Sequence, residues 1–265
     1  MMQLICPVIG WLIWLFFYLH WQLQLLWRRL HALVCRSCDY WQCDQRELFK
    51  RASHELEKLP QHLVLVIAPD ERYVDAALLK NILSYALNIG IKYLSIYDTR
   101  TARTGHVELS KLCEPTKSRA MLWPPSKQKE QNGNCNGTRN GYAGNGLHPT
   151  QLQVYQIGHD DCHALIADVC RELYEQSAEA KQKLLQKRET LTDAISAGLN
   201  KRLEFAVPEP ELGIVFAKQT CTYGLLPWHV RFTEFHTHHS GRYFGARTFL
   251  QVLYKYARCE QRWGK

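Results

Sequence analysis

The chain has 265 residues, 46% of them hydrophobic, which is enough to bury the core of one large domain with attachments. Its formal net charge of +8 favours anionic partners, such as a membrane surface, phosphate groups or nucleic acid. The basic residues are scattered, with local clusters at 127–129 and 181–188, and no nucleic-acid-binding motif accompanies them. We therefore expect no nucleic-acid partner.

The first feature along the chain is an apolar stretch at 4–27 that contains no Lys, Arg, Asp or Glu. A helix needs about 20 mostly apolar residues to cross a bilayer, so this stretch predicts a transmembrane helix in contact with membrane lipid. A cleaved signal peptide is the alternative, but it would begin with positive charge and end at small residues. Because Arg28, Arg29 and Arg36 follow, the positive-inside rule places the rest of the chain in the cytosol. We therefore expect a retained anchor with a basic flank at 1–30.

Cysteines cluster just after this anchor, at Cys35, Cys38 and Cys43, in a segment at 31–58 that we interpret as a juxtamembrane linker and helix. A Cys-x-x-Cys pair with a third cysteine could hold zinc, although a second pair at zinc-finger spacing is missing. Cysteines beside a membrane segment can also be acylated. The other cysteines show no disulfide framework, which fits a reducing compartment.

Amphipathic segments and continuous apolar runs then alternate. The segment 45–59 has the apolar spacing of an amphipathic helix. Apolar runs at 62–68 and 91–98 are typical of strands buried on both faces, and the stretch at 71–90 between them predicts a helix that ends near Gly90. This strand–helix–strand unit implies a parallel sheet with a right-handed crossover.

The second half of the chain continues this alternation after an interruption. Residues 124–150 are rich in Asn and Gly with few large apolar residues, so we interpret them as a flexible insertion. Beyond them we expect strands at 151–158 and 211–217 and helices at 160–176, 189–203 and 243–262. The predicted fold class is α/β, with a central parallel β-sheet flanked by helices in a domain at 59–265.

Histidines gather late in the chain, at His236, His238 and His239, just after Glu234. Alternate residues of a strand project to one face, so His236 and His238 could bind a metal together. No further carboxylate stands at an obvious ligand spacing, and we interpret the segment as a solvated loop. The chain also lacks a Gly-x-Gly-x-x-Gly motif, a P-loop and a Gly-x-Ser-x-Gly elbow, so none of these sites is predicted.

Several stretches together resemble one enzyme family. They are the strand pair HLVLVIA and YLSIYD, the segment PEPEL followed by LLPWHVRFTEF, and the final YKYARCEQRWGK. These stretches resemble the cis-prenyltransferases, and most closely their membrane-anchored accessory branch, the non-catalytic subunits of dehydrodolichyl diphosphate synthase complexes. The resemblance covers about residues 55–100 and 150–265, and PEPEL, LLPWH and the terminal EQR-x-GK are its most specific parts.

The departures from catalytic members of this family are equally informative. Those members end their first strand with Asp-Gly-Asn, whose Asp handles magnesium diphosphate, whereas this chain has Ala68 there. At the positions of two diphosphate-binding arginines it has Val215 and Cys221. None of these side chains can bind Mg²⁺ or neutralise a phosphate. Glu234 matches a metal-side glutamate of the family but cannot rebuild the site alone. The resemblance therefore implies a chain that is inactive by itself, with Mg²⁺ bound mainly by a catalytic partner subunit.

The last residues carry the part of the resemblance that implies function. Taken alone, Arg262 and Gly264 suit an ordinary helix end, because basic residues and glycine are favoured there. In the family, however, this Arg-x-Gly of one subunit reaches into the active site of the other. The resemblance thus implies that Arg262 and Gly264 complete the site of a catalytic cis-prenyltransferase subunit, dehydrodolichyl diphosphate synthase.

The reaction that the resemblance implies acts on isoprenyl diphosphates. It adds isopentenyl diphosphate stepwise to farnesyl diphosphate and gives a long polyprenyl diphosphate for dolichol synthesis and protein glycosylation. The expected location is the endoplasmic reticulum membrane, with a single span and the C-terminal domain facing the cytosol. A membrane receptor or scaffold that uses a degenerate fold of this family as a binding surface is the alternative function.

Overall fold

The computed structural model describes residues 11–24, 26–27, 30, 45–125, 151–204 and 207–259. The chain divides into two compact units, 1–44 and 45–265. In the first unit, residues 11–24 are helical. Among the described residues, no helix has both the length and the apolar character needed to span a bilayer. Part of the predicted anchor lies outside the described residues, as do Cys35, Cys38, Cys43 and residues 126–150 of the expected insertion.

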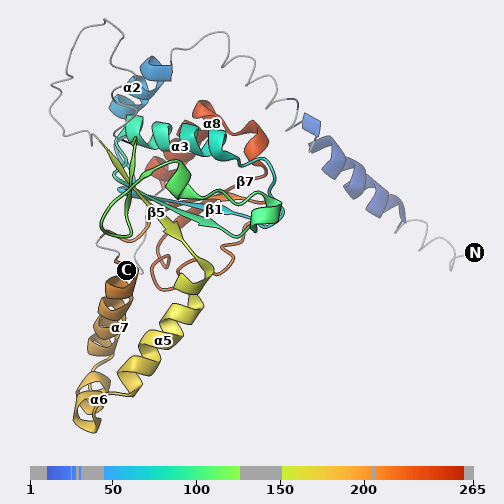
Figure 1. The fold of residues 1–265 in the computed structure, drawn as a ribbon. Helices are drawn as coiled ribbons and strands as arrows, with labels where there is room; N and C mark the ends of the chain where they lie inside the picture. The colour runs from blue at the N-terminus through green and yellow to red at the C-terminus, as the bar shows by residue number, and fades with distance from the viewer. Residues whose placement is uncertain are drawn as a thin grey trace, which may run out of the picture. The chain divides into compact units, whose positions relative to one another are not determined.

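The second unit is built on a seven-stranded sheet with the order β3-β4-β5-β2-β1-β6-β7 (Figure 1). Its strands are β1 (His62–Ile67), β2 (Tyr93–Asp98), β3 (Glu114–Pro115), β4 (Met121–Trp123), β5 (Leu152–Ile157), β6 (Leu212–Phe216) and β7 (Glu234–His238). The run β5-β2-β1-β6-β7 is parallel, which confirms the predicted parallel sheet. The antiparallel β3 and β4 were not predicted, because strands of two and three residues are too short to give an apolar pattern.

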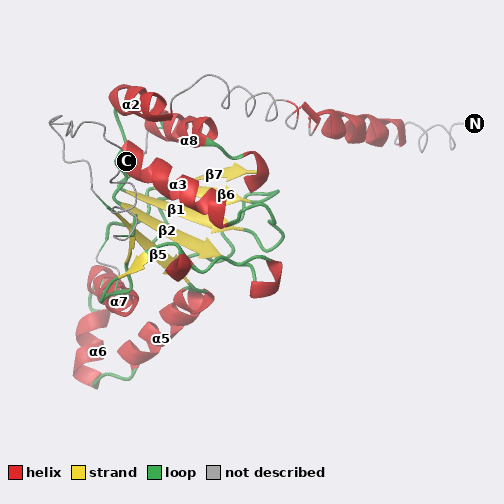
Figure 2. Cartoon of the chain, turned by 45° about the horizontal axis from the view of Figure 1, so that its top comes forward, coloured by secondary structure: helices red, strands yellow, loops and turns green. Residues whose placement is uncertain are grey.

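The α-helices described in this unit are α2 (Gln45–Glu55), α3 (Ala76–Ile89), α5 (His163–Tyr174), α6 (Ala178–Leu185), α7 (Arg188–Leu203) and α8 (Ala246–Arg258). Figure 2 shows α2, α3 and α8 together on one side of the sheet, and α5, α6 and α7 on the other. Five of these helices were predicted, with α3 ending before Gly90 as expected. The helix α3 begins later than predicted, because the Asp75 carboxylate caps it by accepting the Leu78 backbone N–H at 2.8 Å.

Apolar side chains bury both faces of the central strand β1, as its continuous apolar run predicted. Leu63, Leu65 and Ile67 belong to the core cluster under α2, α3 and α8. Val64 and Val66, which alternate with them, belong to a second cluster on the opposite face. The helix α2 also contributes side chains to the first cluster, so the compact unit begins there and not at the 59 boundary that we expected.

Helices α5, α6 and α7 form an arm that extends away from the sheet (Figure 1). A small cluster of Val169, Ile195 and Leu199 joins α5 to α7. The two helices approach closely at Gly198, where an added Cβ would lie 2.7 Å from a methyl carbon of Val169. The helix α6 was not predicted, since the sequence pattern there showed only a basic cluster.

The histidine-rich segment is not the solvated loop that we expected. His236 and His238 lie in β7, which pairs in parallel with β6, and only His239 follows the strand. The His238 ring is hydrogen-bonded to the Ser240 carbonyl at 2.8 Å and packs edge-on against Phe244, 5.1 Å between ring centres. The described residues hold no group of three His, Cys, Asp or Glu side chains that could bind a metal. The strand was not predicted because it contains only one apolar residue among polar ones and so shows no apolar run.

Candidate functional site

The parallel strands define two edges of the sheet, a carboxyl edge where β1, β2, β5, β6 and β7 end and an amino edge where they begin. Ala68 directly follows β1 at the carboxyl edge, and Val215 is the penultimate residue of β6 beside it. Both side chains are fully buried, in an apolar cluster that includes Tyr97, Leu225 and Leu226. These positions offer neither an oxygen ligand nor a charge, so they do not fit Mg²⁺ or a diphosphate.

The remaining polar candidates near this edge do not replace the missing ligands. Asp70 is half exposed and forms an ion pair with Lys218 at 3.0 Å, and this hydrogen bond lowers the pKa of its carboxyl group. Cys221 is exposed in the loop that follows β6. The carboxyl edge therefore has no set of donors for a metal among the described residues.

The loop that follows β6 folds over the carboxyl edge, and a side chain of β2 holds it there by a hydrogen bond. The Tyr97 hydroxyl donates to the Tyr223 carbonyl at 3.0 Å, and burial raises the pKa of Tyr97 to about 12. Tyr223 and Gly224 have φ angles of 52° and 79°, in the left-handed region, which turns the chain so that Leu225 and Leu226 enter the core. The loop thus adds Leu225 and Leu226 to the apolar cluster that contains Ala68 and Val215.

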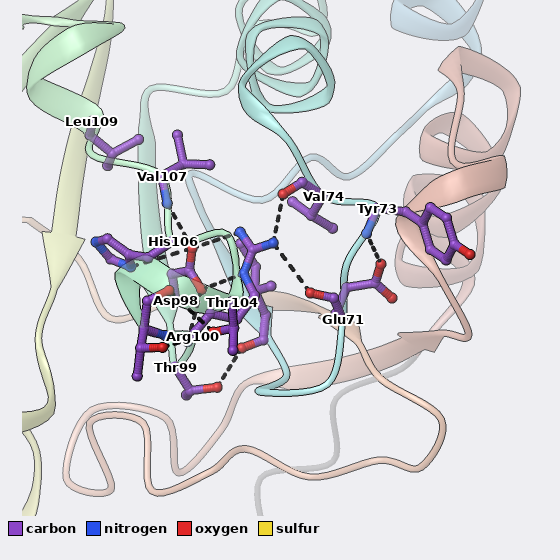
Figure 3. Close-up of polar contacts among 12 residues, drawn as sticks. Glu71, Tyr73, Val74, Asp98, Thr99, Arg100, Thr104, His106, Val107 and Leu109 are labelled. Carbon is purple, nitrogen blue, oxygen red and sulfur yellow. Dashed lines mark hydrogen bonds and ion pairs between the residues drawn. The ribbon is translucent and has the colours of Figure 1, made fainter.

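A buried ion pair, which we call the loop clasp, organises the loops after β1 and β2 (Figure 3). Arg100 binds Asp98 with both arms of its guanidinium, Nε to Oδ1 and Nη2 to Oδ2, each at 2.8 Å. The two side chains are 1% and 2% exposed. Arg100 Nη1 also donates to the carbonyl oxygens of Val74 at 2.8 Å and Glu71 at 3.3 Å. The guanidinium of Arg100 is thus bound to groups within the chain, so it does not replace the arginines that are absent at positions 215 and 221.

Sequence reasoning missed the loop clasp because the stretch after β2 was interpreted only as a loop. The Asp98 carboxylate also accepts the Val107 backbone N–H at 3.3 Å, and the ring of His106 lies 3.5 Å from it. The available signal was an Asp two residues before an Arg at the end of a buried strand. That pattern places both charges where they must pair to be buried.

Two of the segments that carried the resemblance, PEPEL and RFTE, meet at the amino edge. The segment Pro208–Leu212, which precedes and enters β6, lies against the segment that enters β7. Thr233 donates its hydroxyl to the Pro210 carbonyl at 2.6 Å, and the Glu234 backbone N–H donates to the Glu211 carbonyl at 3.0 Å. The Glu211 carboxylate also accepts the backbone N–H of Gln61, just before β1. These bonds join the PEPEL and RFTE segments to each other and PEPEL to the residue before β1.

The LLPWH stretch joins the apolar cluster around Ala68 and Val215 to α7. The Trp228 indole N–H donates to the Ser196 hydroxyl at 2.9 Å, and His229 lies 3.0 Å from the Asn200 side-chain oxygen. Leu225 and Leu226 are buried in the sheet-side cluster at the other end of the stretch. The motif is therefore a structural connector between the sheet and the arm.

The amino edge also contains a buried histidine, His62, the first residue of β1. His62 lies 2.7 Å from the Pro208 carbonyl through Nδ1 and 2.8 Å from the Ser95 hydroxyl through Nε2. The carbonyl can only accept, so Nδ1 carries the proton and Nε2 accepts from Ser95, as a neutral imidazole requires. Burial lowers the pKa of His62 to about 4. Sequence reasoning did not single out this residue.

The His62 site predicts a pH dependence of stability. Between the folded pKa of about 4 and the ordinary value of 6.5, the unfolded chain binds more protons. The stability is therefore complete above about pH 6.5 and falls as the pH approaches 4, by roughly 3 kcal/mol from this group. Urea unfolding followed by tryptophan fluorescence from pH 7 to 4 should show this loss, and His62→Gln should reduce it. An unchanged pH dependence in His62→Gln would contradict the assignment, and exposed His54→Gln serves as the control.

Glu234 does not lie beside Ala68. It begins β7 at the amino edge, in register with Leu212, whereas Ala68 lies beyond the register pair of Ile67 and Phe216 at the other end. One Glu234 oxygen contacts the His236 ring at 2.7 Å, and the other is buried without a hydrogen-bond partner among the described residues. Within this chain, Glu234 therefore does not lie at the carboxyl edge with Ala68 and Val215.

The helix α8 (Ala246–Arg258) ends near the amino edge. Tyr256 in its last turn is fully buried, and burial, together with the nearby Glu211 and Glu234 carboxylates, raises its pKa to about 12. The Lys58 ammonium, just before β1, lies 4.3 Å from the centre of the Tyr256 ring. The chain therefore reaches Cys259 at the amino edge, one strand length from Ala68.

The predicted site residues Arg262 and Gly264 lie outside the described residues. The strands of the sheet separate the two edges by about 13 Å or more. The described part of the chain thus ends, at Cys259, at the edge opposite Ala68 and Val215.

Comparisons with known proteins agree with the motifs. No protein-family model matches the chain. It is 27% identical over 230 residues to the human dehydrodolichyl diphosphate synthase complex subunit NUS1, covering 83% of this chain and 72% of that protein. It is 25% identical over 231 residues to the mouse subunit Nus1, covering 85% and 70%.

Two solved structures are also similar. Lavandulyl diphosphate synthase from Lavandula x intermedia has a TM-score of 0.48 at 16% identity, covering 78% of this chain and 98% of that one. A probable undecaprenyl diphosphate synthase from Campylobacter jejuni has a TM-score of 0.45 at 13% identity, covering 78% and 100%. The two curated relatives confirm the resemblance that the motifs indicated, to the accessory branch of the cis-prenyltransferases that includes the Nogo-B receptor.

Proposed function

We propose that this chain is the accessory subunit of a heteromeric cis-prenyltransferase. The complex would condense isopentenyl diphosphate with farnesyl diphosphate and supply long-chain polyprenyl diphosphate for dolichol synthesis and protein glycosylation. The names of the curated relatives support a subunit of such a complex. The observation that carries the proposal is the burial of Ala68 and Val215 in apolar contacts, while the C-terminal tail begins at the opposite edge.

The proposed roles of the two subunits follow from the side chains that this chain has at the carboxyl edge and in its C-terminal residues. Ala68 and Val215 cannot hold a metal or a phosphate, so the catalytic partner would supply the Mg²⁺ ligands and most diphosphate contacts. This chain would add Arg262, whose planar guanidinium can donate two hydrogen bonds to one phosphate, and Gly264, whose backbone N–H is not shielded by a side chain. Both groups stabilise negative charge that develops as a diphosphate leaves.

The proposed location is the membrane of the endoplasmic reticulum, with a single span and the C-terminal domain facing the cytosol. The apolar stretch at 4–27 and the arginines that follow it support this orientation. A membrane anchor keeps the complex close to a product whose long hydrocarbon chain is poorly soluble in water.

The proposed role predicts activity only in the presence of a partner. The purified chain should not elongate prenyl diphosphates, and co-purification with a catalytic cis-prenyltransferase subunit should give turnover above that of the partner alone. Ala68→Asp should leave the isolated chain inactive, because Val215 and Cys221 still replace the phosphate-binding arginines. Incorporation of labelled isopentenyl diphosphate into long-chain products measures each case. Turnover by the chain alone would refute the accessory role, and failure to stimulate any partner would favour the receptor or scaffold function.

A further inference from the structure

The basic cluster at 181–188 is a sequence feature that the proposed function does not use. It holds four basic residues and no acidic one, between Glu179 and Glu189. The structure places it in α6 and in the turn into α7. Figure 1 shows α6 at the end of the arm farthest from the sheet. We call Tyr174 and residues 181–188 the arm tip.

Two large apolar side chains are exposed at the arm tip. Tyr174, the last residue of α5, is 74% exposed, and Leu185, the last residue of α6, is 72% exposed. The next most exposed large apolar side chain described in the compact unit is Phe232, at 54%. Exposing a leucine and a tyrosine to water at a projecting end is unfavourable, and exposed apolar surface of this kind marks binding sites.

One cation lies over Tyr174, and two more follow Leu185 in the sequence. The Lys181 ammonium lies 4.7 Å from the centre of the Tyr174 ring, and Lys187 and Arg188 are exposed just after Leu185. Within the described part of the chain, these three cations form no ion pair, whereas arginines nearer the sheet on the same arm are paired. The arm tip thus combines unpaired positive charge with exposed apolar surface.

We propose that the arm tip binds the surface of an anionic phospholipid bilayer. Lys181, Lys187 and Arg188 would contact the headgroup phosphates, while Leu185 and Tyr174 enter the interfacial layer beneath them. Lysine suits this arrangement because its apolar stem lies along hydrocarbon while its ammonium reaches the phosphate. Charge alone would fit any polyanion, but an exposed leucine between cations fits a lipid interface. Each cation near an anionic surface strengthens binding about fivefold, which for three gives on the order of 100-fold.

Amide hydrogen exchange on the full chain tests this inference independently of enzymatic activity. The chain would be mixed with an excess of nanodiscs made of neutral phosphatidylcholine, or of phosphatidylcholine with phosphatidylserine. We expect the amides of 178–188 to exchange at least tenfold more slowly with the anionic nanodiscs. Replacing Lys181, Lys187 and Arg188 by glutamine should abolish this difference. Raising the salt concentration from about 0.1 to about 1 M should also abolish it, because the Debye length falls from about 10 to about 3 Å.

Matched variants separate the lipid interface from a simple charge effect. Replacing the exposed Lys80, Lys92 and Lys117 by glutamine removes the same charge outside the arm and should keep the difference. Leu185→Gln should weaken the protection, and Leu185→Met should keep it. Equal exchange with both nanodiscs, or protection that persists in the triple arm variant, would overturn the proposal. Equal protection by soluble polyphosphate would also overturn it, since charge alone would then suffice.

Discussion

Replacing Arg262 by alanine should lower the prenyl-transfer activity of the complex at least tenfold. A charge-assisted hydrogen bond to a phosphate contributes roughly 1.5–3 kcal/mol, and about 1.4 kcal/mol corresponds to tenfold in rate. Gly264→Val should also lower the activity, because a branched side chain blocks the close approach of the backbone to a diphosphate. Steady-state incorporation of labelled isopentenyl diphosphate by the purified complex gives both values.

The control for this experiment is Arg258, which ends α8 and is exposed. Arg258→Ala removes an equal charge one turn earlier and should change the activity by less than twofold, as for most exposed positions. Size-exclusion chromatography should show that all three variants still form the complex. Wild-type activity in Arg262→Ala would mean that the tail is an ordinary helix end, with no role in the partner's site.

Replacing Arg100 by methionine should destabilise the compact unit by about 3–5 kcal/mol, because it leaves the Asp98 carboxylate buried without its counter-charge. The two side chains are 1% and 2% exposed, so water cannot compensate for the loss. The change also removes the donors to the Val74 and Glu71 carbonyls, which hold the loop after β1. Urea unfolding at neutral pH measures the effect as a lower transition midpoint.

Two comparisons make this result specific to the buried pair. Arg171→Met breaks an ion pair with Asp168 whose side chains are 64% and 47% exposed, and it should cost less than about 1 kcal/mol. The double variant Asp98→Leu with Arg100→Met removes both charges and should recover a large part of the loss. A small effect of Arg100→Met, similar to that of Arg171→Met, would show that the loop clasp does not stabilise the fold.

The sheet was predictable because its central strands are continuous apolar runs, of which Leu63–Ile67 is the clearest. Periodicity also indicated α3, whose end at Gly90 follows from the left-handed φ of 98° there. The strand that contains His236 and His238 was not predictable in the same way. This strand, β7, is an outermost strand of the sheet, and it is extended because it pairs with β6. The local sequence does not reveal that pairing.

The family motif pointed to positions of the candidate site, whereas tertiary contacts decide what surrounds them, and the assignment of Arg262 and Gly264 stays a prediction. Ala68 and Val215 were identified by their positions, and the structure adds that both are buried in apolar contacts. The Asp98–Arg100 pair left a local signal, but the contacts of His62 with Pro208 and of Arg100 with Val74 join residues that lie far apart in sequence. A single sequence contains no signal for such pairings, whereas it shows charge and apolar spacing directly.

The pairing of β1 with β6 also sets the order in which the chain can fold as it is synthesised. Leu63 in β1 pairs with Leu212 in β6, about 150 residues later. At a synthesis rate of about 5–20 residues per second, the ribosome needs roughly 8–30 s to make the intervening chain. During that time β1 and β2 can pair with each other, but the other edge of β1, an apolar strand, has no neighbour. Open apolar edges pair readily with other chains, so the nascent protein is most exposed to aggregation in the interval before β6 is made.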